Sequence, residues 1–595
     1  MNSNEPSAVS ATWLGNVLAG AGLGLGVGAL LVGSLVSVLH VRLNPGLGLG
    51  AVLACWLFFA LFYGLILALG VGGLTGVLSL RVAWRDRVDL VRGLGLFGVL
   101  AVFFEAIALY GLTYDQTLFF APQTIVGMTA YLVVAGLLVA LGVGLACWAL
   151  MRVVARLGER DRLRRACAAL ASFAFVAHLL AAFLFRPAPA PGPTVTETEV
   201  KIVETELDVV LVALDGTDPR VIERRLADGD LPEWRRLMNS GAYGPLETLP
   251  QANSAVIWAS VYSGYERHRH GVLDFYRVRI PGTGEGVFPV HRTWFKELLQ
   301  PLGLLDLVVI SRPDLKRLPL WEITDHFGLE TGVVDGYLYS YPALEPVTPG
   351  GYFLSYGLGD SYLPNAPEGD LTALPFYLQP VDLFQGDPLP RGIDLEWQTD
   401  ATLRLLKSRP QPRLLNFYTH EPDAIQHSDW PAWEPERFFP WQRSVEGRSI
   451  DRTHDSFDRL FADLEAAAGP NTVFLVVSDH GHSATPVHKL MSQHRHGPPG
   501  VLLAWGGPIQ RGLAVSDAHV FDIAPTVLHL LGLPVPDDAP GRVLTELFED
   551  AFNERFPVRT VPHYEGMWKA RDLDASRGPE LNAEELEKLK AMGYI

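Results

Sequence analysis

The sequence predicts an α/β domain for the larger part of this 595-residue chain, preceded by an all-helical membrane domain of about five helices. Two observations predict this division. Long apolar stretches fill the first 190 residues, whereas short apolar runs that stop at polar residues alternate with amphipathic segments from residue 206 onward. The charge divides at the same place, with 12 Lys and Arg against 7 Asp and Glu in residues 1–190, and 36 against 58 thereafter.

The membrane domain is expected over residues 1–186. Each of its apolar stretches approaches or exceeds the roughly 20 residues that a helix needs to cross about 30 Å of hydrocarbon. We therefore predict five transmembrane helices, at residues 12–40, 48–80, 90–113, 124–151 and 166–185. The second and third are the least certain in form, because a Gly-rich run such as 63–80 also suits a kinked or re-entrant element.

The loops between these stretches predict the orientation of the chain. Residues 81–92 carry four arginines and residues 152–165 carry six, whereas residues 113–123 carry no Lys or Arg. Cationic loops stay on the cytoplasmic side, so the N-terminus is expected inside. An odd number of spans then places everything after about residue 186 outside. We expect a multi-pass protein of the cell (inner) membrane with an extracytoplasmic, periplasmic catalytic domain.

A Pro-rich linker is expected over residues 187–205, because proline fixes the backbone and removes hydrogen-bond donors. Buried strands that alternate with helices then indicate one sheet covered by helices on both faces, over residues 206–549. Residues 276–410 are rich in Pro, Gly and aromatic side chains and are expected to form an insertion or cap. Residues 550–595 are a C-terminal tail that ends in a charged amphipathic helix.

Composition excludes several kinds of site from the second part. All three cysteines (Cys55, Cys147 and Cys167) lie in the apolar first part, so a metal site after residue 190 must use His and carboxylates. The net charge of −17 argues against nucleic-acid binding, which needs clustered Lys and Arg to neutralise phosphates.

Acidic and imidazole side chains follow three of the expected strands. Asp215 directly follows the run VVLVAL, and Asp479 and His480 follow VFLVV after one serine. Asp423 and His427 follow LLNFYTHEP at a spacing of four, which places both side chains on one face if the segment is helical. Polar groups just past the carboxyl ends of strands are where α/β sheets place their chemistry.

Together with the intervening segments, these sites resemble the alkaline phosphatase superfamily, and within it the type I phosphodiesterase/nucleotide pyrophosphatase branch. The resemblance covers roughly residues 206–545. It is carried by VALDGTDPRVIERRLADGDLPEWRRLMNSGAYGPLETLP, SAVIWASVYSGYERHRHGVLDF, DAIQH, VVSDHGH, HRHGPPGVLLAWGGPI and DIAPTVLHLLGLPVPDDAPGRVL. It implies an alkaline-phosphatase-like core sheet, a serine or threonine nucleophile and two divalent metal ions.

The resemblance implies a role for each matching residue. Ser254 matches the nucleophile, which also binds metal, because it lies nine residues before the Ser-Gly pair where the family has Thr-Gly. The other ligands of the first metal are Asp215, Asp479 and His480, and those of the second are Asp423, His427 and His496.

The sequence leaves one ligand of the second metal undecided between two histidines. His496 is preferred to His494 because it lies four residues before Gly500, ahead of a strand, as in relatives that read HxxxG. His482 and His488 lie near the same motifs, and it stays open whether they are structural, contact a leaving group or bind a third ion.

The chain departs from two branches of the superfamily. Nucleotide-cleaving relatives carry Pro and Asn two and three residues after the nucleophile, where this chain has Val256 and Ile257, so nucleotide specificity is in doubt. Asn253 is a candidate to replace that Asn, with a turn role as the equal alternative. The sulfatase signature needs Pro and Arg that are absent after Ser254, which argues against that branch.

The expected function is a membrane-anchored hydrolase of phosphoric esters, most simply diesters, that acts through a phosphoseryl intermediate. No Ser-His base is evident in the sequence, so metal coordination is the simplest way to activate Ser254. A His/Asp ligand set favours zinc. A transferase that acts on lipid or envelope glycan is the alternative, and a non-catalytic protein that binds a phosphorylated ligand is a weaker one. Expected partners are phosphate esters of lipid, nucleotide or glycan.

Overall fold

The computed structural model describes most of residues 200–565, in the ranges 200–249, 252–284, 286–288, 299–300, 302–337, 339, 352–354, 395–407, 411–443, 449–486, 491–494 and 497–565. It also describes residues 44 and 47–79 and scattered positions between 13 and 40. The chain divides into two compact units. The first comprises Met1–Pro191 and Arg277–Leu307, and the second comprises Gly192–Tyr276 and Val308–Ile595.

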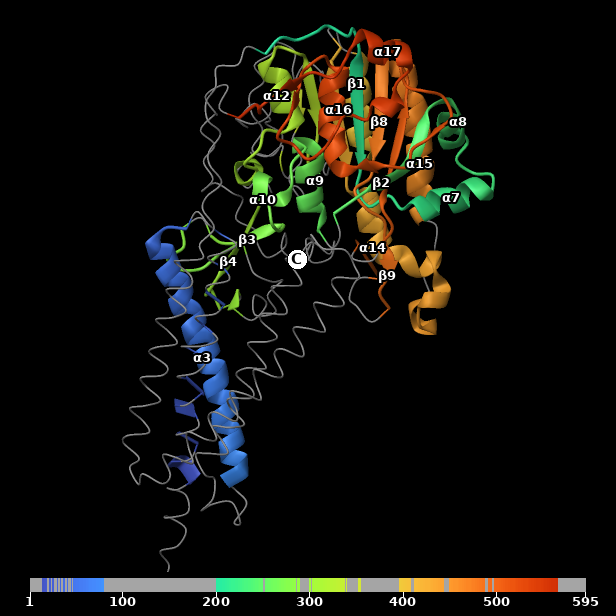
Figure 1. Cartoon of the computed structure of the whole chain (residues 1–595). Coiled ribbons are helices and arrows are strands. Elements are labelled where there is room, and N and C mark those ends of the chain that lie inside the picture. The colour runs from blue at the N-terminus through green and yellow to red at the C-terminus, as the bar shows by residue number, and fades with distance from the viewer. Residues whose placement is uncertain are drawn as a thin grey trace, which may run out of the picture. The chain divides into compact units, whose positions relative to one another are not determined.

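Within the first unit, helix α3 (Leu49–Ser79) is the main described element (Figure 1). It confirms that the second apolar stretch is helical without a break. Five leucines at a spacing of four residues are more than half exposed along it, which suits a helix that faces hydrocarbon: Leu53, Leu57, Leu61, Leu65 and Leu69. Among the described residues this is the one helix long and apolar enough to cross a membrane, over the 22 residues Leu49–Gly70. The last three predicted spans lie outside the described residues.

The first unit also includes a segment far along the chain. Asn44 donates from Nδ2 to the Phe288 carbonyl (3.1 Å), and its Oδ1 accepts from the Phe288 N–H (2.8 Å). These two bonds join the loop before α3 to residues that the sequence assigned to the insertion of the catalytic domain. The contacts of residues 277–307 thus place part of that insertion with the N-terminal unit.

The second unit is built around one nine-stranded mixed sheet of described strands, with the order β12-β2-β11-β8-β1-β7-β5-β6 and β13 paired with β2. The central strands are β1 (Asp208–Leu214), β7 (Leu414–Thr419), β8 (Thr472–Val477) and β11 (Gly500–Trp505). The outer strands are β2 (Ala242–Glu247), β5 (Thr331–Val334), β6 (Tyr352–Leu354), β12 (Leu513–Ala514) and β13 (Ala518–His519). Strands β8, β1, β7, β5 and β6 are parallel, whereas β11 runs antiparallel to β8 and β2.

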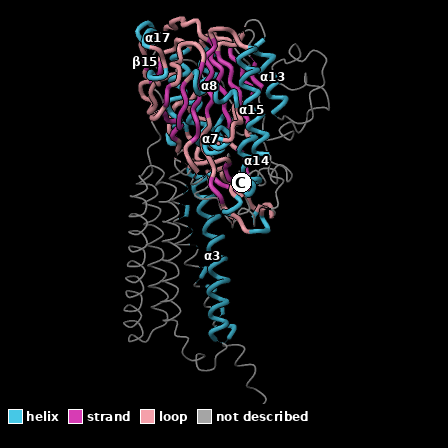
Figure 2. Tube along the Cα trace, turned by 90° about the vertical axis from the view of Figure 1, so that its right-hand side faces the viewer, coloured by secondary structure: helices cyan, strands magenta, loops and turns pink. Residues whose placement is uncertain are grey.

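Helices cover both faces of this sheet, as the sequence predicts (Figures 1 and 2). One layer contains α8 (Pro232–Ser240), α13 (Leu395–Lys407) and α15 (Ser449–Ala467), which contact one another or the central strands. The other contains α9 (Ser254–Ser263), α12 (Leu320–His326) and α16 (Ile523–Leu530). The other described α-helices of this unit are α7 (Pro219–Ala227), α10 (Arg267–His270), α14 (Glu421–Trp433) and α17 (Asp550–Arg555).

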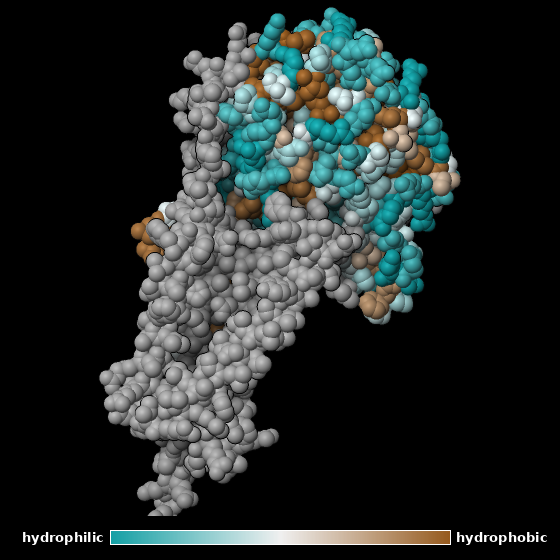
Figure 3. Space-filling model, in the orientation of Figure 1, coloured by the Kyte–Doolittle hydropathy of each residue, from teal (hydrophilic) through white to brown (hydrophobic). Residues whose placement is uncertain are grey.

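The alternation of side chains along β1 explains why this strand lies at the centre. Val210, Val212 and Leu214 pack into the core cluster formed with α8, α13 and α15, among them Trp234 and Phe461. The intervening residues of the strand face the other layer and are equally buried. A strand buried on both faces reads as a continuous apolar run, which is the pattern DVVLVAL. The outer surface of the unit is largely hydrophilic on the face shown in Figure 3.

The expected insertion over residues 276–410 is only partly outside the core. Strands β5 and β6 lie in this range and extend the central sheet. The run TGVV is too short, and too closely flanked by glycine and charged residues, to stand out as a strand. In the tail, α17 and β15 (Thr560–Val561) are described, and β15 pairs with Val535–Pro536. The amphipathic helix expected at the C-terminus lies outside the described residues.

Candidate active site

The carboxyl ends of three neighbouring strands bring the predicted residues together. Strand β1 lies between β8 and β7, all parallel, and each ends at the same edge of the sheet. Asp215 follows β1, and Asp479 follows β8 after one serine. Helix α14 begins two residues after β7 and carries Asp423 and His427, so that segment is helical as the spacing of four suggests.

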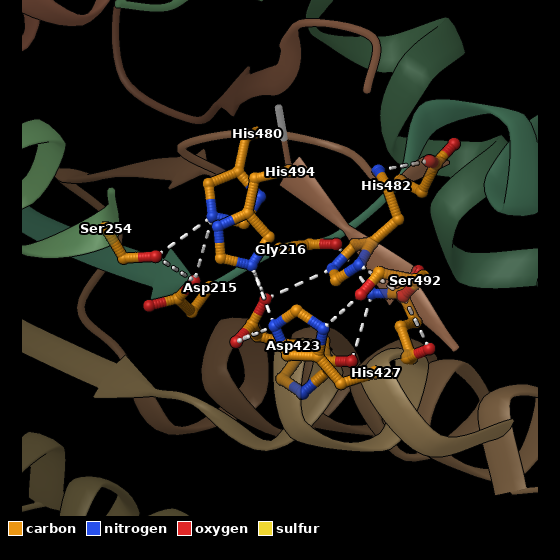
Figure 4. A network of polar contacts seen from close by, with 12 residues as sticks. Asp215, Gly216, Ser254, Asp423, His427, His480, His482, Ser492 and His494 are labelled. Atoms are coloured by element: carbon orange, nitrogen blue, oxygen red, sulfur yellow. Dashed lines mark hydrogen bonds and ion pairs between the residues drawn. The ribbon is translucent and has the colours of Figure 1, made fainter. Parts of the chain in front are cut away.

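The first group of acidic and imidazole side chains, here called the Asp215 cluster, consists of Asp215, Asp479 and His480. One ligand atom from each lies within 4.8 Å of the others, and all three residues are buried. Ser254, the first residue of α9, points into this cluster (Figure 4). Its hydroxyl donates to Asp215 Oδ1 (3.3 Å) and lies 2.9 Å from His480 Nε2. The sequence therefore missed one feature, because an imidazole does stand next to the candidate nucleophile.

Buried donors fix both carboxylates of the Asp215 cluster. Asp215 Oδ2 accepts hydrogen bonds from the Tyr418 hydroxyl (2.6 Å) and from Trp258 Nε1 (2.9 Å). The Gly216 N–H donates to Asp479 Oδ1 (2.9 Å). One oxygen of each carboxylate is thus held by the core, and the other, Asp215 Oδ1 or Asp479 Oδ2, faces His480.

The second group, here called the Asp423 cluster, is rich in imidazoles. Asp423 Oδ1 lies 2.9 Å from His494 Nε2 and 3.1 Å from His482 Nε2, and Asp423 Oδ2 lies 3.4 Å from His427 Nε2. Ligand atoms of Asp423, His480, His482 and His494 all lie within 4.8 Å of one another. His480 therefore belongs to both clusters, and Figure 4 shows the side chains converging from α14 and from the loops after β8.

His482 is the residue whose place in the site the sequence left open. It lies two residues past His480, and its backbone N–H donates to Asp218 Oδ2 (2.8 Å), which fixes that loop. Gly216 makes room for it. A Cβ atom at position 216 would lie 2.8 Å from His482 Nε2 and 2.9 Å from Asp423 Oδ1, and the glycine has a left-handed φ of +67°. The Asp-Gly pair after β1 is thus required by the packing of the site as well as by a turn.

The residues of both clusters fit divalent cations. Both oxygens of Asp423, Oδ2 of Asp479 and Nε2 of His482 are buried without a hydrogen-bond partner. Buried polar atoms are normally satisfied, so converging acceptors that lack donors indicate a cation between them. Imidazole and carboxylate ligands without cysteine are a donor set that suits zinc, among other divalent metals.

Burial and mutual repulsion dominate the electrostatics of the site. Burial raises the pKa of Asp215 well above its ordinary value, and the charges of Asp479 and Asp423 raise it further. Burial likewise raises the pKa of Asp479 to about 8. Burial lowers the pKa of His482 and of His494 to about 4. Near pH 7 and without a cation, these shifts favour a protonated Asp479 and neutral imidazoles on His482 and His494.

Other sequence-based expectations have mixed outcomes. Asn253 caps α9, since its Oδ1 accepts from the Val256 N–H (3.2 Å) and its Nδ2 donates to Asp274 (2.9 Å). Both ends of its amide are engaged, which favours the structural alternative. His494 enters the Asp423 cluster, whereas His496 and His488 lie outside the described residues. The choice of His496 therefore stays a prediction.

Comparison with known proteins decides the family. Residues 209–557, more than half of the chain, match the family model of type I phosphodiesterase / nucleotide pyrophosphatase. The chain belongs to this family. Membership supports an enzyme that acts on phosphoric esters. The matched range covers both clusters, the nucleophile candidate and the nine described strands of the central sheet, except for the first residue of β1.

This phosphodiesterase-family chain also resembles individual proteins over shorter stretches. It is 36% identical over 92 residues to the 2,3-bisphosphoglycerate-independent phosphoglycerate mutase of Agrobacterium fabrum, which is 15% of this chain and 17% of that protein. It is 32% identical over 99 residues to the mutase of the same name from Chromohalobacter salexigens, 16% of this chain and 18% of that protein. The chain thus spans less than a fifth of the length of these curated relatives.

Two similar solved structures are of ectonucleotide pyrophosphatase / phosphodiesterase 5. The murine protein, in an inactive variant complexed with AMP, aligns with a TM-score of 0.39 and 13% identity over 58% of this chain and 100% of that chain. The human protein aligns with a TM-score of 0.40 and 12% identity over 58% of this chain and 100% of that chain.

Proposed function

We propose that this protein is a membrane-anchored, two-metal hydrolase of phosphoric esters, preferentially diesters, that works through a phosphoseryl intermediate on Ser254. The observation that carries the proposal is the position of the Ser254 hydroxyl, 3.3 Å from Asp215 Oδ1 and 2.9 Å from His480 Nε2, beside a second cluster of ligands. A nucleophile, a proton acceptor and converging unpartnered ligand atoms are the parts that phosphoryl transfer needs.

Each cluster has a proposed ion and a set of ligands. Asp215, Asp479, His480 and Ser254 would hold the first ion, and Asp423, His427 and either His494 or His496 would hold the second, with His482 adjacent. When bound, the two ions lower the pKa of attacking hydroxyl groups and offset negative charge on the phosphoryl oxygens. Zinc is the metal that we expect, because imidazole nitrogen supplies several ligands.

The residues of the chain supply the steps around Ser254. Its hydroxyl donates to Asp215 Oδ1, so the Ser254 proton would pass by way of that carboxylate to the departing oxygen, while Oγ forms a bond to phosphorus and the bond from phosphorus to that oxygen breaks. The start of α9 favours negative charge on Oγ, because unpaired N–H groups at a helix N-terminus carry partial positive charge. Water then breaks the phosphoserine bond and restores the hydroxyl.

A phospho-group transferase is the second candidate. The curated relatives are named as phosphoglycerate mutases and not as hydrolases, and the same intermediate can be resolved by an alcohol. Five predicted spans also exceed what simple tethering needs, and α3 supports at least one of them. In that case, the phospho group would accumulate on a lipid or envelope glycan. A non-catalytic role is the weakest alternative, since both clusters retain several ligands.

The proposed location follows the same reasoning. The Arg-rich loops at 81–92 and 152–165 favour the cytoplasmic side, which leaves residues after 186 outside the inner membrane if five helices span it. A reporter enzyme that works only in the periplasm should be active when it is fused after residue 595. Activity of a cytoplasmic reporter at this point would contradict the topology.

The function is tested on the full chain purified in detergent, with metal content measured beside hydrolysis of chromogenic phosphate mono- and diesters. We expect about two zinc ions per chain, Ser254-dependent cleavage and a preference for diesters. Bound metal without release of product into water would favour the transferase. A protein that takes up no divalent metal would contradict the proposal.

A further inference from the structure

Ser492 links the two histidines that flank Asp423. Its backbone carbonyl lies 2.7 Å from His427 Nδ1, and its hydroxyl oxygen lies 2.8 Å from His482 Nδ1. The same hydroxyl donates to the Gln426 carbonyl at 2.7 Å, and Ser492 is fully buried. One residue thus contacts the Nδ1 side of both rings (Figure 4).

These contacts fix which nitrogen of each ring carries the proton. A carbonyl only accepts, so His427 Nδ1 donates to Ser492. The Ser492 hydroxyl has a single hydrogen, which is directed at Gln426, so its oxygen accepts from His482 Nδ1. A neutral imidazole that donates from Nδ1 has an unprotonated Nε2 with a lone pair. Nε2 of His482 is therefore prepared as a ligand.

The lone pair of His482 faces an anion. Nε2 of His482 is 3.1 Å from Asp423 Oδ1, and neither atom has a hydrogen-bond partner. Two acceptors at this distance repel each other inside a buried site unless a cation lies beside both. His494 Nε2 lies 2.9 Å from the same oxygen and is a third atom at that position that could ligate a cation.

We propose that His482 is a direct ligand of the ion in the Asp423 cluster, and that Ser492 is the positioning residue that sets its tautomer. The inference rests on the proposed function in one respect, because it assumes that the Asp423 cluster binds a divalent ion. Gly216 is part of the arrangement, since any side chain there would occupy the approach to His482 Nε2. An ion with this additional imidazole would have a nitrogen-rich environment, which favours zinc over manganese or magnesium.

The side chain and the backbone of Ser492 can be separated experimentally. Replacing Ser492 by Ala removes the hydroxyl that orients His482 and leaves the carbonyl that orients His427. Replacing Ser492 by Thr keeps a hydroxyl in place. The pair of variants therefore isolates the effect on His482, and a ligand variant, His482→Asn, removes the imidazole itself.

The test uses the full-length protein in detergent, loaded with Co²⁺ or Zn²⁺. Metal affinity is measured by competition with a chromophoric chelator, and the visible absorption of the Co²⁺ form reports the number of ligands. We expect His482→Asn to lower the affinity for one of the two ions by at least about 100-fold and to change the absorption of the Co²⁺ form. Ser492→Ala should lower the affinity for the same ion by about 10- to 100-fold. Ser492→Thr should restore affinity to near the wild-type value.

His454→Asn is the matched control. His454 is also a buried histidine that binds a backbone carbonyl through Nδ1 (2.8 Å), and its Nε2 lacks a hydrogen-bond partner, but it lies on α15 outside both clusters. This variant should bind both ions as the wild type does. If His482→Asn folds poorly by its melting curve, Ser492→Ala against Ser492→Thr decides the question.

The outcomes separate this inference from the proposed function. His482→Asn and Ser492→Ala could both bind two ions with wild-type affinity and show an unchanged Co²⁺ spectrum. That result would overturn the role of His482 and leave the proposal of a two-metal hydrolase standing. A wild-type protein that binds no divalent ion would overturn both. If Ser492→Ala and Ser492→Thr lost metal affinity equally, the Ser492 hydroxyl would not be what positions His482.

Discussion

The two ligand clusters differ in how the fold holds them. In the Asp215 cluster, carboxylates predominate and are fixed by donors from the sheet and α9, such as Tyr418 on β7. In the Asp423 cluster, imidazoles predominate, and two of them, His427 and His482, are oriented by Ser492, which lies in the short strand β10 (Ser492–Gln493). Under the proposed function, the first cluster would position the nucleophile, and the second would hold an ion with several nitrogen ligands. His480 is shared by both.

The largest expected effect comes from Ser254→Ala, which removes the proposed nucleophile. Loss of a nucleophile that acts with its neighbours as a unit costs turnover by at least about 10³-fold. Hydrolysis of a chromogenic diester measures this, and Ser263→Ala, at a buried serine of the same helix that binds the Ala259 carbonyl, is the matched control. If Ser254→Ala kept wild-type turnover, the Asp215 cluster would not be the site that positions the nucleophile.

The substitutions Asp215→Asn and Asp423→Asn test whether each cluster binds its own ion. Each substitution replaces a charged ligand, so each variant should retain one ion instead of two and lose turnover by about 100-fold or more. Metal analysis of the purified variants measures the stoichiometry. If either variant still bound two ions tightly, the assignment of one ion to each cluster would be wrong.

The pKa shifts predict how the metal-free protein responds to pH. The pKa of Asp479 is about 8 in the fold against an ordinary value of 3.8, so its folded carboxyl keeps a proton that the unfolded chain releases. The free energy of unfolding therefore falls as pH rises from about 4 to about 8. His482 and His494, with pKa values of about 4, act in the opposite direction only below about pH 6.5.

The informative window is thus pH 6.5 to 8. Chelator-treated protein should melt at a lower temperature at pH 8 than at pH 6.5, because the buried Asp479 must then ionise without a cation. Zinc-loaded protein should not show this decrease, since the ion takes the place of the proton. A metal-free protein whose melting temperature is constant or rises across this window would argue against protonated carboxyl groups in the cluster.

The smallest expected effect comes from Tyr418→Phe. The substitution keeps the ring packed against Trp258 and deletes one hydrogen bond of 2.6 Å to Asp215 Oδ2. A charge-assisted hydrogen bond contributes about 1.5 to 3 kcal/mol, so turnover should fall by about 10- to 100-fold. The loss should appear in kcat and in affinity for the first ion, with KM little changed. A change in KM alone would assign Tyr418 to substrate binding.

The same contrast explains what the sequence could predict. Asp215 and Asp479 follow short apolar runs that are typical of buried strands, and the carboxyl ends of parallel strands meet at one edge of a sheet. Asp423 and His427 follow from helical spacing. Tyr418 and Trp258 carry no such signal, because each reads as an ordinary aromatic residue of a strand or helix until the fold places it beside Asp215.

The loop between β8 and β11 was less predictable for a physical reason. His482, Ser492 and His494 lie in a segment without the periodicity of a strand or a helix, so nothing in the local sequence says which side chains turn inward. The resemblance to the family points to His496, which lies outside the described residues, and among the described residues of this segment the structure brings His482 and His494 to Asp423. A signal was present in the clustering of histidines, which is unusual for a solvated loop.

The most direct measurement of the central claim is to stop turnover of a diester with acid and map the covalent adduct by mass spectrometry. We predict that the peptide containing Ser254 carries the phosphoryl ester of the substrate, and that the adduct is absent in Ser254→Ala. Rapid turnover with an unmodified Ser254 peptide, or an adduct on another residue, would contradict a phosphoseryl mechanism at this site.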